Sequence, residues 1–135
     1  MKIAAMTILL ACAVAVGACG SQEPIKVAKS SPYYRGAVAF REHCAGCHTL
    51  ATVDAQGSAT SIGNRVKTNG PNFNIRKENV EQALYAIRNG GFSGAIMPQN
   101  IVVGPQAQEV AAFLAAYSGH QAKTVPSTNI TLSTK

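Results

Sequence analysis

The motif CAGCH at residues 44–48 constrains this chain more than any other part of its sequence. Two cysteines lie three positions apart, and a histidine follows the second one directly. Residues at i and i+3 share a face on a helical turn, so Cys44 and Cys47 can act on one bound group. Three kinds of site use such residues: a metal ion, a redox-active dithiol, and a covalently attached haem.

The N-terminal segment predicts export and reduces the number of cysteines in the mature chain. Lys2 precedes an apolar stretch at residues 3–18 that ends in small residues, which is typical of a secretory signal rather than a membrane span. The sequence VGAC at residues 16–19 resembles the bacterial lipobox, which implies cleavage before Cys19 and attachment of lipid to its sulfur. The alternative is ordinary signal cleavage, with Cys19 removed or left free.

Cleavage of the leader also removes Cys12, so that an exported and lipidated protein keeps only Cys44 and Cys47 as thiols. A structural zinc site needs four ligands, and His43 and His120 lack the paired spacing that would complete one. A thioredoxin-like dithiol begins a helix after a βαβ pattern, whereas this pair comes late in an expected helix without strands. Both interpretations are therefore weak.

Covalent haem attachment accounts best for the motif, because C-x-x-C-H is the signature of c-type haem attachment. Cys44 and Cys47 on one turn can reach the two vinyl groups at one edge of the porphyrin. His48, one residue further on, supplies a nitrogen to the iron. An exported protein gains from this bond because the haem cannot be lost to the surroundings.

The apolar pattern predicts three helices joined by long loops. Apolar residues recur every three or four positions from Tyr33 to Cys47, from about Glu78 to Asn89, and from Pro105 to Gly119. Residues 50–77 show no such pattern and are rich in glycine, which predicts a long loop. We find no internal repeat and no alternating pattern typical of strands.

We expect four parts along the chain. They are a signal peptide at residues 1–18, the lipidated cysteine with a flexible tether at 19–32, a folded domain at 33–118, and a disordered tail at 119–135. The chain has few aromatic residues with which to build a hydrophobic core: four Tyr, four Phe and no Trp. A cofactor with a large apolar face would compensate for it.

The sequence resembles the class I cytochromes c, small carriers with one haem, over about residues 33–118. The resemblance rests on GAVAFREHCAGCH at residues 36–48, GPNF at 70–73, IRNGGFSGAIMP at 87–98 and VAAFLAAY at 110–117. It implies an all-α fold of about three main helices and long loops around one covalently bound haem c. In that fold Gly36 and Phe40 of the first helix meet the last helix.

The resemblance also implies the ligands of the iron. The carbonyl of Pro71 would accept a hydrogen bond from the axial imidazole of His48, and Met97 would supply the sulfur ligand. An isolated methionine is more often a core filler, but Met97 is the only one outside the leader and stands before Pro98 in a glycine-rich loop. His43, expected to point away from the haem, and His120 are rival ligands and are more typical of surface histidines.

The net charge indicates solubility or an acidic partner surface rather than nucleic-acid binding. The net charge is +6, from twelve Lys and Arg against six Asp and Glu, and it is scattered without long basic runs. Arg65, Lys67, Arg76 and Lys77 flank the expected haem loop. Either Arg65 or Arg76 pairs with a haem propionate, or this loop is simply solvated. The loop at residues 51–63 covers a haem edge or extends into solvent.

These features predict a lipid-anchored cytochrome c that is not an enzyme. It would carry single electrons between membrane respiratory complexes, facing the periplasm or the cell exterior, and would bind the membrane through Cys19. One alternative is a subunit of a larger oxidase or dehydrogenase complex. Another is a haem-based sensor or peroxidase, which needs a vacant or displaceable sixth position and which Met97 opposes.

Overall fold

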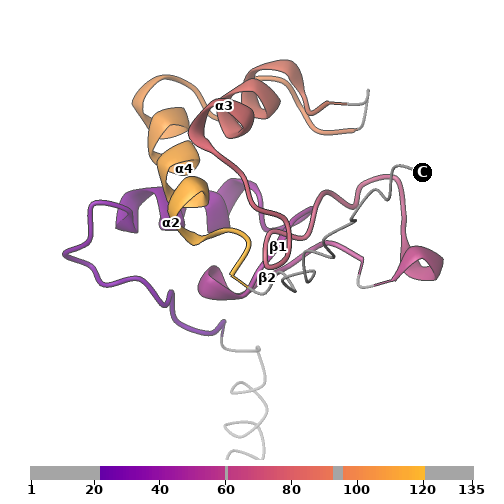
Figure 1. Cartoon of the computed structure of the whole chain (residues 1–135), viewed down its shortest axis with the longest axis horizontal. Coiled ribbons are helices and arrows are strands. Elements are labelled where there is room, and N and C mark those ends of the chain that lie inside the picture. The colour runs from indigo at the N-terminus through magenta and orange to yellow at the C-terminus, as the bar shows by residue number, and fades with distance from the viewer. Residues whose placement is uncertain (1–21, 60, 93–95, 121–135) are drawn as a thin grey trace, which may run out of the picture.

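Three α-helices form the framework of the protein in a computed structural model that describes residues 22–59, 61–92 and 96–120 (Figure 1). The elements, in chain order, are α2 (Tyr34–His43), β1 (Thr49–Leu50), the 3-10 turn η2 (Ala51–Val53), β2 (Ala55–Gln56), the 3-10 turn η3 (Ile62–Asn64), α3 (Val80–Asn89) and α4 (Gly104–Tyr117). The expected all-α fold is confirmed, with long loops between the helices.

Helices α2 and α4 cross at Gly36, and the crossing forms the centre of the core (Figure 1). A Cβ atom at Gly36 would overlap the backbone carbonyl of Glu109 and would lie 2.8 Å from the Cβ atom of Phe113. Glycine therefore allows the two backbones to approach closely. Phe40 and Phe113 fill the space beside this contact, with ring centroids 5.8 Å apart and neither side chain exposed.

Side-chain caps explain why α3 begins at Val80 rather than at Glu78. Asn79 has extended backbone geometry, its side chain accepts a hydrogen bond from the N–H of Gln82 (2.8 Å), and the Gln82 side chain accepts one from the N–H of Asn79 (3.0 Å). This capping box sets the first turn. Gly90, with φ of 73°, ends the helix in the left-handed conformation, as predicted.

Helix α2 ends at His43, so the two cysteines follow the helix instead of lying in it as the apolar pattern indicated. Cys44 is the C-terminal cap, and its carbonyl accepts hydrogen bonds from the N–H groups of both Cys47 (3.1 Å) and His48 (3.0 Å). The tight turn still places both thiols on one side of the chain. It then leads directly into β1.

A short antiparallel hairpin with two residues in each strand follows the turn. The sequence analysis did not predict it. Thr49 pairs with Gln56 and Leu50 with Ala55, and Asp54 takes a left-handed conformation (φ of 55°) just before β2. Two residues per strand are too few to produce an alternating pattern in the sequence. The hairpin packs inward, because the side chains of Leu50 and Val53 are almost completely buried.

Residues 22–32, the described part of the expected flexible tether, pack on the folded domain instead. The side chain of Val27 is buried in the core. Glu23 donates its N–H to the carboxylate of Asp54 (3.0 Å), and Lys26 donates its N–H to the carbonyl of Thr52 (2.8 Å). This segment therefore packs on the domain, because apolar side chains among its polar residues find a place in the core.

The chain after α4 also remains attached to the domain for two residues of the expected tail. Gly119 donates its N–H to the carbonyl of Phe73 (2.8 Å). The signal peptide, Cys19 and the tail from residue 121 lie outside the described residues. Within the described ranges, no helix is both long enough and apolar enough to cross a membrane.

Candidate functional site

One pocket brings together all five residues that the sequence analysis assigned to a haem site. Cys44, Cys47, His48, Pro71 and Met97 each line it. Apolar side chains from all three helices complete its walls, namely Phe40, Ala83, Ile87, Val110 and Leu114. Residues from distant parts of the chain thus converge on a single apolar pocket, which is the common form of a cofactor site.

The two cysteines are free thiols at one end of this pocket, Cys44 buried and Cys47 partly exposed. Burial, followed by the proximity of Cys47, raises the pKa of Cys44 to about 12. A thiol with a raised pKa is a poor thiolate nucleophile, which disfavours a redox-active dithiol. The described residues also contain no cluster of three or more His, Cys, Asp or Glu side chains that could hold a metal ion.

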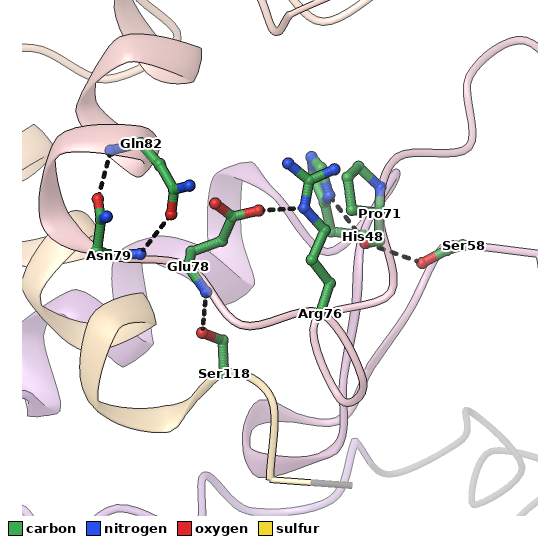
Figure 2. Close-up of polar contacts among 8 residues, drawn as sticks. All are labelled: His48, Ser58, Pro71, Arg76, Glu78, Asn79, Gln82 and Ser118. Atoms are coloured by element: carbon green, nitrogen blue, oxygen red, sulfur yellow. Dashed lines mark hydrogen bonds and ion pairs between the residues drawn. The ribbon is translucent and has the colours of Figure 1, made fainter. Parts of the chain in front are cut away.

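His48 is held as a neutral imidazole with one nitrogen free. Its Nδ1 lies 3.2 Å from the carbonyl oxygen of Pro71, which can only accept, so Nδ1 carries the proton and Nε2 keeps its lone pair (Figure 2). Burial lowers the pKa of His48; the hydrogen bond to Pro71 opposes this effect, and the charge of Arg76 adds to it. A neutral imidazole with free Nε2 is the form that binds iron.

The imidazole ring of His48 sits between an aromatic ring and a glycine. The ring of Phe73 stacks on it, with centroids 4.8 Å apart and an interplanar angle of 17°. A Cβ atom at Gly70 would overlap the imidazole, lying 2.5 Å from Nδ1 and 2.8 Å from Nε2. Gly70 also donates its N–H to the carbonyl of Cys47 (2.7 Å). Only glycine leaves room for the ring here.

Replacing Gly70 with alanine should therefore displace the axial imidazole. Overpacking a site of this kind costs about 1–3 kcal/mol, and the ring is the group that must move. We expect a clear loss of haem-loaded protein and an altered absorption spectrum in what remains, measured as pigment per protein. Gly63→Ala is the control, because a Cβ atom there meets nothing within 4 Å. Wild-type pigment content in Gly70→Ala would contradict the proposed role of Gly70.

Ser58 is a supporting residue that the sequence analysis did not single out. Its hydroxyl donates to the same carbonyl of Pro71 (3.2 Å) that accepts from His48, and its oxygen accepts from the N–H of Thr49 (2.8 Å) (Figure 2). Ser58 thereby fixes the direction of the Pro71 carbonyl and, through it, the imidazole. Nothing in the local sequence distinguishes this serine from its neighbours.

The 51–63 loop packs against the CAGCH turn at Gly57. A Cβ atom at Gly57 would lie 2.5–2.6 Å from backbone atoms of Ala45, Gly46 and Cys47. Ser61 and Gly63, further along the loop, are exposed. The loop thus supports the turn at one end and reaches solvent at the other.

Met97 is partly buried and packs against the core while lining the pocket. Gly90 and Gly91, with φ of 73° and 85°, turn the chain back after α3. A Cβ atom at Gly90 would lie 2.7 Å from the carbonyl oxygen of Met97, and the N–H of Asn100 donates to the carbonyl of Ile87 (2.7 Å). The loop carrying Met97 is therefore fastened to the end of α3.

The two rival histidines lie in different places. His43 is exposed but does line the pocket, contrary to the expectation that it points away. The reason is that α2 ends at this residue and the chain turns there. His120 is exposed and bonds through Nε2 to the carbonyl of Ala116 (3.0 Å), and it is not among the residues that line the pocket.

The basic residues expected around the haem also separate into two groups. Arg65, Lys67 and Arg76 line the pocket. Lys77 instead donates to the carbonyl of Ala115 (2.5 Å) at the end of α4. The Arg76 side chain forms an ion pair with Glu78, an acidic residue of the pocket that the sequence analysis did not single out.

The residues present fit a covalently bound haem. Cys44 and Cys47 would attach the haem through their thiols, and Nε2 of His48 and the thioether of Met97 would bind its iron. The apolar walls suit a porphyrin face. When bound, the haem supplies the one-electron iron couple, while the residues described above attach it, orient its ligand and exclude water.

Comparisons with known proteins agree with this site. The model of the cytochrome c family matches residues 33–118. The crystal structure of the c-type cytochrome SorU from Sinorhizobium meliloti is similar, with 28% sequence identity and a TM-score of 0.50 over 69% of this chain and 97% of that chain. No curated protein sequence matches. With haem c as its covalently bound cofactor, the chain belongs to the cytochrome c family.

Proposed function

We propose that this cytochrome c is a single-electron carrier held at the outer face of a bacterial membrane by lipid on Cys19, passing electrons between membrane respiratory complexes. One observation supports the carrier role: His48 and Met97 line the same pocket, where both would be available as ligands of the iron. An iron with both axial positions filled exchanges electrons without binding a substrate.

The same observation argues against a haem-based sensor or peroxidase, because either would need an open sixth position. A thioether ligand also stabilises reduced iron relative to a second imidazole, which raises the potential. The apolar walls and the buried His48 keep the iron in a dry environment. These properties favour fast electron exchange over chemistry at the metal.

The rim of the pocket supports docking of a protein partner. Phe92 and Ile96 line the pocket although they are 57% and 58% exposed, and the exposed residues Arg65, Lys67 and Arg76 line the same pocket. Exposed apolar and basic side chains at one pocket fit a partner surface that carries both apolar and acidic groups. Such complementarity steers encounter and gives a complex short-lived enough for repeated turnover.

The anchor would hold the domain close to the membrane. Glu23 is already bonded to Asp54, so that only residues 20–22 lie between Cys19 and the folded domain. At about 3.3–3.6 Å per residue, the extended chain from Cys19 to Glu23 spans roughly 14 Å. The haem would therefore stay within reach of neighbouring membrane complexes and would not diffuse away.

Replacing Cys19 with serine is the experiment that tests the anchor. The variant should release folded, red, fully ligated protein from the membrane, or leave it held by an uncleaved leader. Fusing residues 20–135 to a leader with an ordinary cleavage site separates these outcomes. Several acyl chains are needed for firm attachment, so this form should be almost entirely soluble after high-salt washing, as measured by haem in the membrane and soluble fractions.

A form starting at Gly20 that still pellets with washed membranes would contradict the lipid anchor. The same preparation tests the carrier role, since the soluble form should lose most of its electron transfer with membranes unless it is added in excess. Co-purification of the wild-type protein with one complex at constant stoichiometry would favour the alternative, a fixed subunit of an oxidase or dehydrogenase.

A further inference from the structure

Glu78 is a buried acidic residue in the wall of the haem pocket. It lines the pocket beside Arg76, and only 4% of the residue is exposed. Burying a carboxylate in an apolar wall is costly unless the charge is paired or serves a purpose. None of the ligand and attachment roles described above uses this side chain.

The backbone holds Glu78 firmly in this position. Its N–H donates to the hydroxyl of Ser118 (2.9 Å), which is buried at the end of α4, and the next residue, Asn79, caps α3 (Figure 2). The residue is thus held between the ends of two helices.

The two oxygens of the Glu78 carboxylate have different surroundings. Oε1 pairs with Nε of Arg76 at 2.5 Å, whereas the buried Oε2 has no hydrogen-bond partner within the part of the chain that the structure describes (Figure 2). The side chain of Arg76 is 48% exposed and that of Glu78 only 5%. Water therefore screens the cation of this pair much more than the anion.

We propose that the buried carboxylate of Glu78 lowers the reduction potential of the bound haem. Its negative charge favours the oxidised iron, which carries one more positive charge than the reduced iron. Arg76 is better screened by water and therefore offsets only part of the field of this carboxylate. This inference rests on the bound haem and is independent of the membrane anchor and of the partners.

The test is a redox titration of purified, haem-loaded Glu78→Gln at neutral pH. Removing the charge should favour reduction by about tenfold, which for a one-electron couple raises the midpoint potential by about 59 mV. Glu109→Gln is the matched control. Glu109 also forms an ion pair, with Arg35 at 3.0 Å, but it does not line the haem pocket, and its loss should leave the potential unchanged.

Arg76→Gln provides a second, opposite test if Glu78→Gln fails to accumulate. Removing the cation leaves the buried anion uncompensated, so the potential should fall below that of the wild type. In each variant the long-wavelength charge-transfer band of the oxidised protein should persist, which shows that the axial ligands are intact. An unchanged or lowered potential in Glu78→Gln, or an unchanged or raised one in Arg76→Gln, would overturn the proposal without affecting the carrier role.

Discussion

Replacing Cys44 and Cys47 with alanine should remove the covalent attachment of haem step by step. Each thiol can form one thioether bond, so either single variant should accumulate less red protein, with its haem held by one bond. The double variant should contain no covalent haem. The measurement is extraction with acid and acetone, which removes free haem and leaves bound haem c on the polypeptide.

Cys19→Ser is the control for this series. Cys19 lies outside the CAGCH motif, so its replacement should leave the haem resistant to extraction. Extraction of the pigment from the wild-type protein, or stoichiometric zinc in place of iron, would contradict the whole assignment.

Loss of haem should also destabilise the fold. A ligand that binds only the folded state stabilises that state. Haem attached covalently stays with the chain, so its stabilising contacts are available whenever the protein folds. Without it, the apolar walls formed by residues such as Ile87 and Leu114 would face water. The double variant should therefore unfold at a markedly lower temperature than the wild type, as followed by circular dichroism.

The helices were predictable because their signals are local. Periodic apolar residues identified all three, and Gly90 and Pro105 marked an end and a start correctly. The boundaries moved where a cap decided them. Asn79 delays α3 by accepting the N–H of Gln82, and the cysteines leave α2 because the carbonyl of Cys44 closes a turn with two later N–H groups.

The candidate site was predictable to the same extent. Cys44, Cys47 and His48 form a contiguous motif, and the family resemblance implied Pro71 and Met97. The supporting residues depend on contacts between distant segments, which no local pattern reveals. Ser58 bonds to a carbonyl thirteen positions away, and Glu78 bonds to a hydroxyl forty positions away.

Residues 22–32, before α2, also show that local sequence does not reveal contacts between distant segments. Its Pro, Ser and charged residues are typical of a flexible tether. One valine and a few backbone hydrogen bonds are enough to dock it, because Val27 enters a core that α2 and its neighbours have already formed. Composition describes what a segment would do alone, and docking depends on the surface beside it.

Replacing Met97 with alanine should open the iron to exogenous ligands. The thioether is the ligand expected opposite His48, and alanine removes it while leaving the surrounding loop attached through Asn100. The long-wavelength charge-transfer band implied by Met ligation should disappear from the oxidised protein. Carbon monoxide should bind the reduced variant at neutral pH but not the reduced wild type, and the potential should fall because a thioether no longer favours reduced iron.

His43→Gln is the matched control, since His43 also lines the pocket and is the rival ligand nearest to it. This variant should keep the band and resist carbon monoxide. If His43 replaces the missing sulfur in Met97→Ala, the double variant with His43→Gln should bind carbon monoxide more readily than the single one. Survival of the band in Met97→Ala would exclude Met97 as the ligand. Because His48 is already fixed by Pro71 and Gly70, the sixth ligand would then have to come from the loop around residues 96–101 or from His43.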